Sequence, residues 1–135
     1  MTLHAEPLES TGETIPEVVE RLRATFATGR TQDREWRITQ LRGIERLCEE
    51  REEEIAAAIA EDLRRDPFGA WLGEIAGTAA EASHARKSLR RWMFPKIKPI
   101  PLTQMPGFAS VRPEPLGTVL VIGPWNYPIY LSLSP

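Results

Sequence analysis

Thiols and imidazoles are scarce in this sequence of 135 residues, which has one cysteine, Cys48, and two histidines, His4 and His84. A single thiol excludes an internal disulfide framework and any zinc site that is built on several thiolates. The two histidines have no other soft ligand near them in the sequence, so little is available to hold a transition metal. We therefore predict no metal site.

Long apolar runs are also missing. No stretch approaches the roughly 18 apolar residues that a membrane span needs, and the first six residues lack the basic start and apolar stretch of a signal peptide. The sequence therefore predicts no membrane span and a cytoplasmic location. Its length and its content of 41% hydrophobic and 27% charged residues are those of one soluble domain, or part of one.

Acidic side chains are rare in the last third of the chain. Residues 86–135 hold 7 basic side chains and 1 acidic one, whereas residues 1–85 hold 10 and 18. Six of the basic side chains lie within thirteen residues, namely Arg86, Lys87, Arg90, Arg91, Lys96 and Lys98. They indicate either a site for nucleic acid or another anion, or the solvated face and last turn of a helix. We favour the helix and predict no nucleic-acid partner.

Apolar residues recur at three- and four-residue steps through residues 14–94, which predicts a helical layer. The first helix, about Ile15–Thr28, begins with the capping-box spacing of Thr14 and Glu17 and ends before Gly29. Residues 1–13 have no such period and predict a flexible arm. The predicted helical layer therefore begins at residue 14.

Three further helices complete the predicted layer. Thr31 or Asp33 caps the second helix, and the acidic run 49–54 marks a break, because acidic side chains favour a helix N-terminus. The third helix runs from Glu52 to about Arg65, and the fourth spans about Phe68–Met93. The fourth helix carries small residues that would let a neighbouring segment approach closely: Gly73, Gly77 and Ala80.

Nine of the twelve prolines lie in residues 95–135, so the helical pattern ends at Pro95. Residues 95–106 predict an extended, proline-rich connection, because proline disfavours the helical region for the residue before it. Residues 107–135 contain two predicted strands. Phe108–Arg112 alternates like an exposed strand or one arm of a hairpin, and Thr118–Ile122 is continuously apolar, which is typical of a strand buried on both faces of a parallel sheet.

The second predicted strand leads directly into the loop Gly123-Pro124-Trp125-Asn126-Tyr127-Pro128. Loops beyond the carboxyl ends of parallel strands line the ligand crevice of such sheets. Two prolines stiffen this loop, and the amide of Asn126 can direct two N–H donors at a developing negative charge. From the residues alone a structural interpretation stays equally open, in which the aromatic pair covers a core and Asn126 satisfies the turn backbone.

The run from Glu114-Pro115-Leu116-Gly117 to Ile122-Gly123-Pro124-Trp125-Asn126-Tyr127-Pro128 resembles the motif that opens the cofactor domain of the aldehyde dehydrogenase superfamily. Upstream segments resemble its class 3 and fatty aldehyde dehydrogenase branch: Arg21–Phe26, Gly29–Thr31, Trp36-Arg37, Gln40-Leu41, Asp62-Leu63 and Trp92. The resemblance implies an α/β parent fold with a Rossmann-type cofactor domain. This chain would be its N-terminal part, mainly helical, with the start of the dinucleotide-binding domain in residues 107–135.

The resemblance also implies roles for the loop. Asn126 would contribute its amide to an oxyanion hole, and Tyr127 would face the substrate passage. Four residues would contact NAD or NADP: Ile122, Gly123, Pro124 and Trp125. The implied reaction is the oxidation of an aldehyde to a carboxylic acid through a cysteine thiohemiacetal and thioester, in a homodimeric enzyme.

The nucleophile is where the sequence departs from the family. Cys48 lies within the apolar stripe of the second predicted helix, which predicts a buried core residue. The family's catalytic cysteine and its water-activating glutamate belong to motifs that this chain does not contain. We therefore expect the 135-residue chain alone to be inactive. A stand-alone helical interaction module without catalysis is the alternative.

Overall fold

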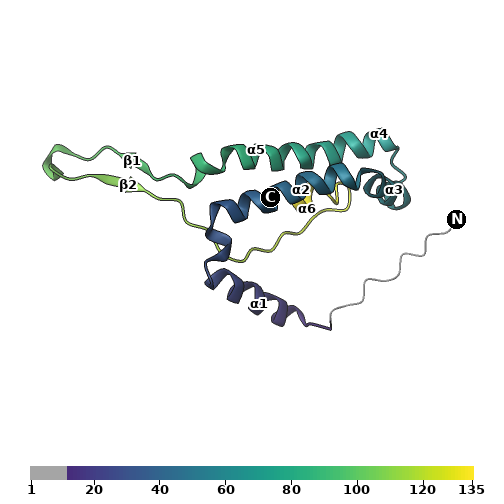
Figure 1. Cartoon of the computed structure of the whole chain (residues 1–135), viewed down its shortest axis with the longest axis horizontal. Helices are drawn as coiled ribbons and strands as arrows, with labels where there is room; N and C mark the ends of the chain where they lie inside the picture. Colours follow the sequence, from purple (N-terminus) through teal and green to yellow (C-terminus); the bar gives the residue numbers. More distant parts are fainter. Residues whose placement is uncertain (1–11) are drawn as a thin grey trace.

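The computed structural model describes residues 12–135, so the predicted flexible arm lies almost entirely outside the described residues. Figure 1 shows a layer of helices from which a two-stranded arm projects at one end. The segment that returns from this arm runs back along the helices to the C-terminus. The described structure therefore has a helical body and one extended projection.

Helix α1 spans Ile15–Ala27 and begins as predicted. The Glu17 carboxylate accepts two hydrogen bonds from Thr14, one from the backbone N–H at 2.6 Å and one from the side-chain hydroxyl at 2.8 Å. These bonds favour the charged carboxylate and lower the pKa of Glu17, the backbone bond most strongly. Gly29 follows at φ +77°, in the left-handed conformation that ends a helix, so the predicted stop is confirmed.

The break between the second and third helices is also confirmed. A short 3₁₀ turn, η1 (Arg30–Gln32), precedes α2 (Arg34–Glu50), and α3 follows at Glu52–Leu63. Of the two predicted caps Asp33 is the one used, because its carboxylate accepts the N–H of Trp36 at 2.7 Å. The first turn of α3 holds the acidic side chains Glu52, Glu53 and Glu54, at the N-terminal, positive end of the helix dipole.

The fourth predicted helix is three consecutive segments. They are α4 (Pro67–Ala70), a π-helical turn η2 (Trp71–Ile75) and α5 (Ala76–Met93). Asp66 caps α4 by accepting the N–H of Gly69 at 2.9 Å. The periodic apolar pattern predicted a regular helix here and contained no sign of the π turn. Such turns are rare and occur often at functional sites.

The core lies mainly between α2 and α5, which run side by side in Figure 1. Its buried apolar side chains come from α2 to α5: Ile38, Cys48, Ile59, Ala70, Ile75, Ala82 and Leu89. Arg86 on α5 donates to the Glu45 carboxylate on α2 at 3.0 Å. One of the six clustered basic residues therefore makes an ion pair within the helical layer.

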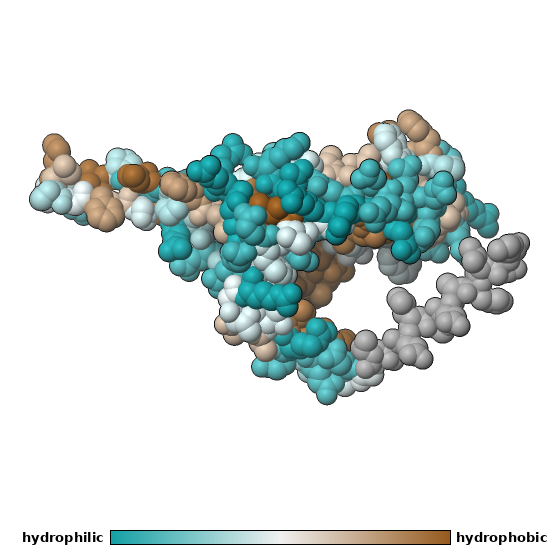
Figure 2. All heavy atoms as spheres, in the orientation of Figure 1, coloured by the Kyte–Doolittle hydropathy of each residue, from teal (hydrophilic) through white to brown (hydrophobic). Residues whose placement is uncertain are grey.

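The arm is a hairpin, which is one of the two structures predicted for Phe108–Arg112. Strand β1 (Lys96–Lys98) pairs antiparallel with β2 (Ala109–Val111), and Ile97 lies opposite Ser110. A 3₁₀ turn, η3 (Leu102–Gln104), lies between them. The arm exposes large apolar side chains, visible as brown patches in Figure 2: Ile97, Leu102, Met105, Phe108 and Val111.

The predicted buried strand at Thr118–Ile122 is wrong for this structure. The segment has no strand conformation, and Leu120 and Ile122 are 84% and 83% exposed. A strand buried on both faces needs hydrogen-bonded neighbours on its two edges and cover on its faces. Within residues 12–135 the two strands are β1 and β2, which pair with each other in the arm. The chain then turns into the short helix α6 (Tyr130–Leu133).

Two helical glycines allow a matched test of the predicted close approach. A Cβ at Gly43 of α2 would meet nothing within 4 Å, whereas one at Gly77 of α5 would lie 3.1 Å from the Tyr130 ring. Both Gly→Ala changes improve helix propensity by about 0.5–1 kcal/mol. Gly43→Ala should therefore stabilise the chain and Gly77→Ala should not, as measured by denaturant unfolding followed by circular dichroism. Equal gains in the two variants would contradict the contact between α6 and α5.

Candidate functional site

The predicted site residues lie in one loop, residues 122–127, immediately before α6. Its backbone rests against the helical layer, while its largest apolar side chain points away from the described residues. Trp125 is 89% exposed, and Ile122 is exposed as well. The loop thus presents an apolar surface that nothing in residues 12–135 covers.

Asn126 is held by its backbone. Its carbonyl oxygen accepts a hydrogen bond from Nη2 of Arg65 at 2.6 Å. Among the described residues no hydrogen bond joins the Asn126 side-chain amide to the turn backbone, as the structural interpretation of this residue would require. The amide donors are therefore available to a ligand.

Arg65 and Glu74 position this loop, and sequence reasoning missed both. Nη1 of Arg65 donates to Oε1 of Glu74 at 2.8 Å, and its guanidinium carbon lies 4.6 Å from the centre of the Tyr127 ring. Oε2 of Glu74 accepts the backbone N–H of Ile129 at 2.8 Å and that of Tyr130 at 3.5 Å. Glu74 is fully buried. A buried carboxylate is stable only when it is paired and hydrogen-bonded, and here both oxygens are.

A signal for Glu74 was present in the sequence. Ala70, Glu74 and Thr78 follow one another at four-residue steps, and all three are buried. A carboxylate in such a row of small residues indicates an internal ion pair rather than a solvated helix surface. The partner was beyond reach, because Arg65 lies nine residues earlier, before the turn that precedes α4.

Three glycines let the loop and α6 approach their neighbours. A Cβ at Gly73 would lie 3.1 Å from the Tyr127 ring, as one at Gly77 would from that of Tyr130. At Gly123 a Cβ would overlap Oγ of Ser132, so any side chain there would force at least the Ser132 hydroxyl to move. The prediction that small residues of the fourth helix admit a neighbour is confirmed for Gly73 and Gly77.

Cys48 is a core residue, as predicted. The residue is 2% exposed. It lies on α2 and faces α5. Burial raises the pKa of the Cys48 thiol, because the charged thiolate would lose its hydration. The thiol therefore lacks the electropositive, accessible surroundings of a cysteine nucleophile.

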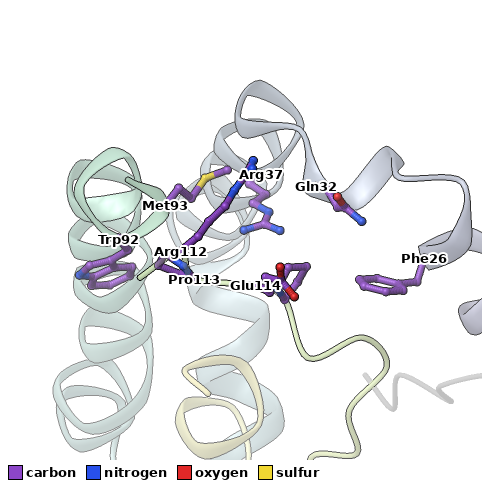
Figure 3. Close-up of a pocket in the computed structure, with 9 residues that line it drawn as sticks. Phe26, Gln32, Arg37, Trp92, Met93, Arg112, Pro113 and Glu114 are labelled. Atoms are coloured by element: carbon purple, nitrogen blue, oxygen red, sulfur yellow. The ribbon is translucent and has the colours of Figure 1, made fainter. Parts of the chain in front are cut away.

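A cavity of about 630 Å³ lies at the base of the arm, where α1, α2 and α5 meet the returning segment. Figure 3 shows Arg37, Trp92 and Glu114 among the side chains that line it. None of the predicted site residues contributes to this cavity. Within residues 12–135 there is no group of three or more potential metal-binding side chains, and no helix has the length and apolar character to cross a bilayer.

The model of the aldehyde dehydrogenase family matches residues 3–134, which is nearly the whole chain. The chain belongs to the aldehyde dehydrogenase family. The resemblance seen in the sequence is thereby confirmed, and it covers the helical layer as well as the loop that holds Asn126.

Family 3 members are among the relatives of this aldehyde dehydrogenase chain. The chain is 42% identical over 118 residues to aldehyde dehydrogenase family 3 member I1, chloroplastic, of Arabidopsis thaliana. This match covers 87% of the chain and 22% of that protein. The chain is 38% identical over 119 residues to human aldehyde dehydrogenase family 3 member B1, covering 88% of the chain and 25% of that protein. The chain therefore spans about a quarter of the length of these relatives.

The fold agrees with that assignment. The structure titled "Substrate bound state of Staphylococcus Aureus AldH" matches with a TM-score of 0.86 and 32% identity, over 90% of this chain and 26% of that one. The predicted aldehyde dehydrogenase fold is confirmed. In this chain it is represented by the mostly helical layer and the two-stranded hairpin.

The burial of Cys48 yields a direct test on the 135-residue chain. A thiol-reactive probe such as Ellman's reagent should modify Cys48 at least ~100-fold more slowly in buffer than in denaturant, since the folded thiol is both inaccessible and kept protonated. Raising the pH from 7 to 9 should accelerate the reaction of the folded chain by a larger factor than that of the unfolded chain, because the unfolded thiol approaches full ionisation near its ordinary pKa whereas the folded thiol, with its raised pKa, does not. Rapid labelling of the folded chain at pH 7 would contradict a core role.

Proposed function

We propose that these residues form part of an enzyme that oxidises an aldehyde to a carboxylic acid with NAD or NADP, in which Asn126 is an oxyanion-hole donor. The observation that carries the proposal is the state of the Asn126 loop. Its backbone is hydrogen-bonded to the helical layer, while its amide stays unengaged by residues 12–135. A donor that is already aimed when charge appears stabilises the transition state without further reorganisation.

In the proposed reaction a cysteine thiolate from another part of the enzyme attacks the aldehyde carbon. Negative charge then develops on the carbonyl oxygen, and an N–H of the Asn126 side-chain amide donates to it. Loss of hydride from the resulting thiohemiacetal leaves a thioester, and an activated water releases the acid. Cys48 has no part in these steps, because it is buried in the core.

The cofactor contacts remain a proposal that rests on the loop surface. A nicotinamide cofactor accepts hydride from the substrate carbon when it is bound. The exposed side chains of Ile122 and Trp125 fit the apolar faces of such a ring, and Pro124 stiffens the backbone between them. Gly123 keeps this backbone against Ser132 of α6, so the surface has a defined position.

Tyr127 is proposed to border the substrate passage. One face of its ring carries the Arg65 guanidinium, and 38% of the residue remains exposed. We propose in addition that the enzyme is a homodimer in the cytoplasm. The exposed apolar side chains of the hairpin arm supply a surface that a second copy could cover.

Asn126→Ala should reduce the turnover of the complete polypeptide in which these residues occur. The expected loss is about 100-fold or more, because one oxyanion donor contributes roughly 3 kcal/mol to lowering the barrier. The measurement is NAD- and NADP-dependent oxidation of a panel of aldehydes. Gln40→Ala removes an exposed amide from α2 and serves as the matched control, which should keep wild-type turnover. Near-normal turnover of the Asn126 variant would refute the assigned role.

The 135-residue chain by itself should show no aldehyde oxidation, because its one thiol is buried and protonated. Purified chain is assayed with both cofactors, with a complete family 3 enzyme as the positive control. Measurable activity in the chain would overturn this expectation. A helical interaction module describes the chain better than an enzyme fragment under two conditions. The gene has a stop codon directly after Pro135, and the purified 135-residue chain is monomeric and unfolds cooperatively on heating.

A further inference from the structure

We propose that Arg65 and Glu74 are positioning residues for the Asn126 amide. This inference rests on the proposed function, since it concerns how the oxyanion donor is held. Neither residue lies in the loop. Arg65 donates to the Asn126 carbonyl within the loop, and Glu74 accepts the backbone N–H groups of Ile129 and Tyr130 just after it.

The first step is the orientation of the Glu74 carboxylate. The π turn Trp71–Ile75 places this side chain at 0% exposure, where both oxygens need partners. One oxygen accepts from Arg65, and the other accepts backbone N–H groups of Ile129 and Tyr130. The start of α6, four residues after Asn126, is thereby tied to the helical layer.

The second step is the geometry of the Arg65 guanidinium. Its planar group sends Nη1 to Glu74 and Nη2 to the Asn126 carbonyl, at 2.8 and 2.6 Å. The same group lies against the ring of Tyr127. Arginine has the fixed fork of donors that two simultaneous bonds require, whereas a lysine ammonium is a single point charge. The segment 126–130 is therefore held at its first carbonyl and at its last two amides.

The third step connects this clamp with catalysis rather than with stability alone. The clamp uses the carbonyl of Asn126, so it restrains the Cα position and leaves the side-chain donors for the oxyanion. A misplacement of about 1 Å can reduce an enzymatic rate by on the order of 100-fold. Loss of the clamp should consequently lower kcat more than it raises the KM for substrate or cofactor.

Asn126 is the only asparagine in the sequence, which permits a test that does not depend on activity. Selective ¹⁵N labelling of asparagine in the 135-residue chain should yield one backbone N–H signal and one side-chain NH₂ pair. In Arg65→Met, the ¹H–¹⁵N heteronuclear NOE of Asn126 should fall and its shifts should move toward random-coil values. Arg65→Lys should recover these signals only in part, because one ammonium does not replace both bonds.

Arg86→Met is the matched control. It breaks the Arg86–Glu45 ion pair within the same helical layer, and that pair makes no hydrogen bond to the loop. The Asn126 signals should be unchanged in this variant. Unchanged Asn126 signals in Arg65→Met, or an equal change in Arg86→Met, would overturn the inference, whether or not the enzyme oxidises aldehydes.

The kinetic arm uses the complete polypeptide. Arg65→Met should lower kcat by about 10- to 100-fold, with KM altered less than about 3-fold. In the Asn126→Ala background the same change should cost little further rate, since the residue through which it acts is gone. Multiplicative losses in the double variant would overturn the positioning role. Absence of aldehyde oxidation in the wild-type polypeptide would instead refute the proposed function and leave the NMR result to decide on the clamp.

Discussion

The buried carboxylate of Glu74 is the interaction on which the C-terminal half of this structure depends. A charge at zero exposure is tolerated only with a full set of partners, and Glu74 obtains them from two places in the sequence. Arg65 precedes α4, and the two amide donors begin α6. Satisfying one side chain therefore joins the helical layer to a loop more than fifty residues away, and the same arginine extends the link to the Asn126 carbonyl.

Small residues make this link sterically possible. Gly73 and Gly77 lie on the helical rod on either side of Glu74, and each meets the ring of a tyrosine, Tyr127 or Tyr130. The π turn lies at this point of the rod, between α4 and α5. Polar anchoring and close packing thus coincide in one region, which holds the loop against the helices while its apolar side chains face outward.

Much of the helical layer could be predicted from the sequence because helices are stabilised locally. Glu17, Asp33 and Gly29 act within a few residues of themselves, and the break at residue 51 follows from nearby acidic side chains. The strand at 118–122 was predicted from apolar character alone, and it is wrong here, because a strand needs partners that apolar character does not supply. The Arg65–Glu74 pair was missed, because Arg65 lies nine residues before Glu74 and ahead of α4, where no helical period connects the two.

The sequence by itself determined the family, through the motif around Asn126, and the places where helices begin and end. It also indicated that Cys48 is a core residue, because its place in an apolar stripe is a local property. Only the tertiary structure decided how the Asn126 loop is held, since Arg65 and Glu74 come from elements that no short-range pattern connects to it. Local propensities determine where the helices form, whereas the hydrogen-bond partners of a buried charge are determined only by how distant segments pack together.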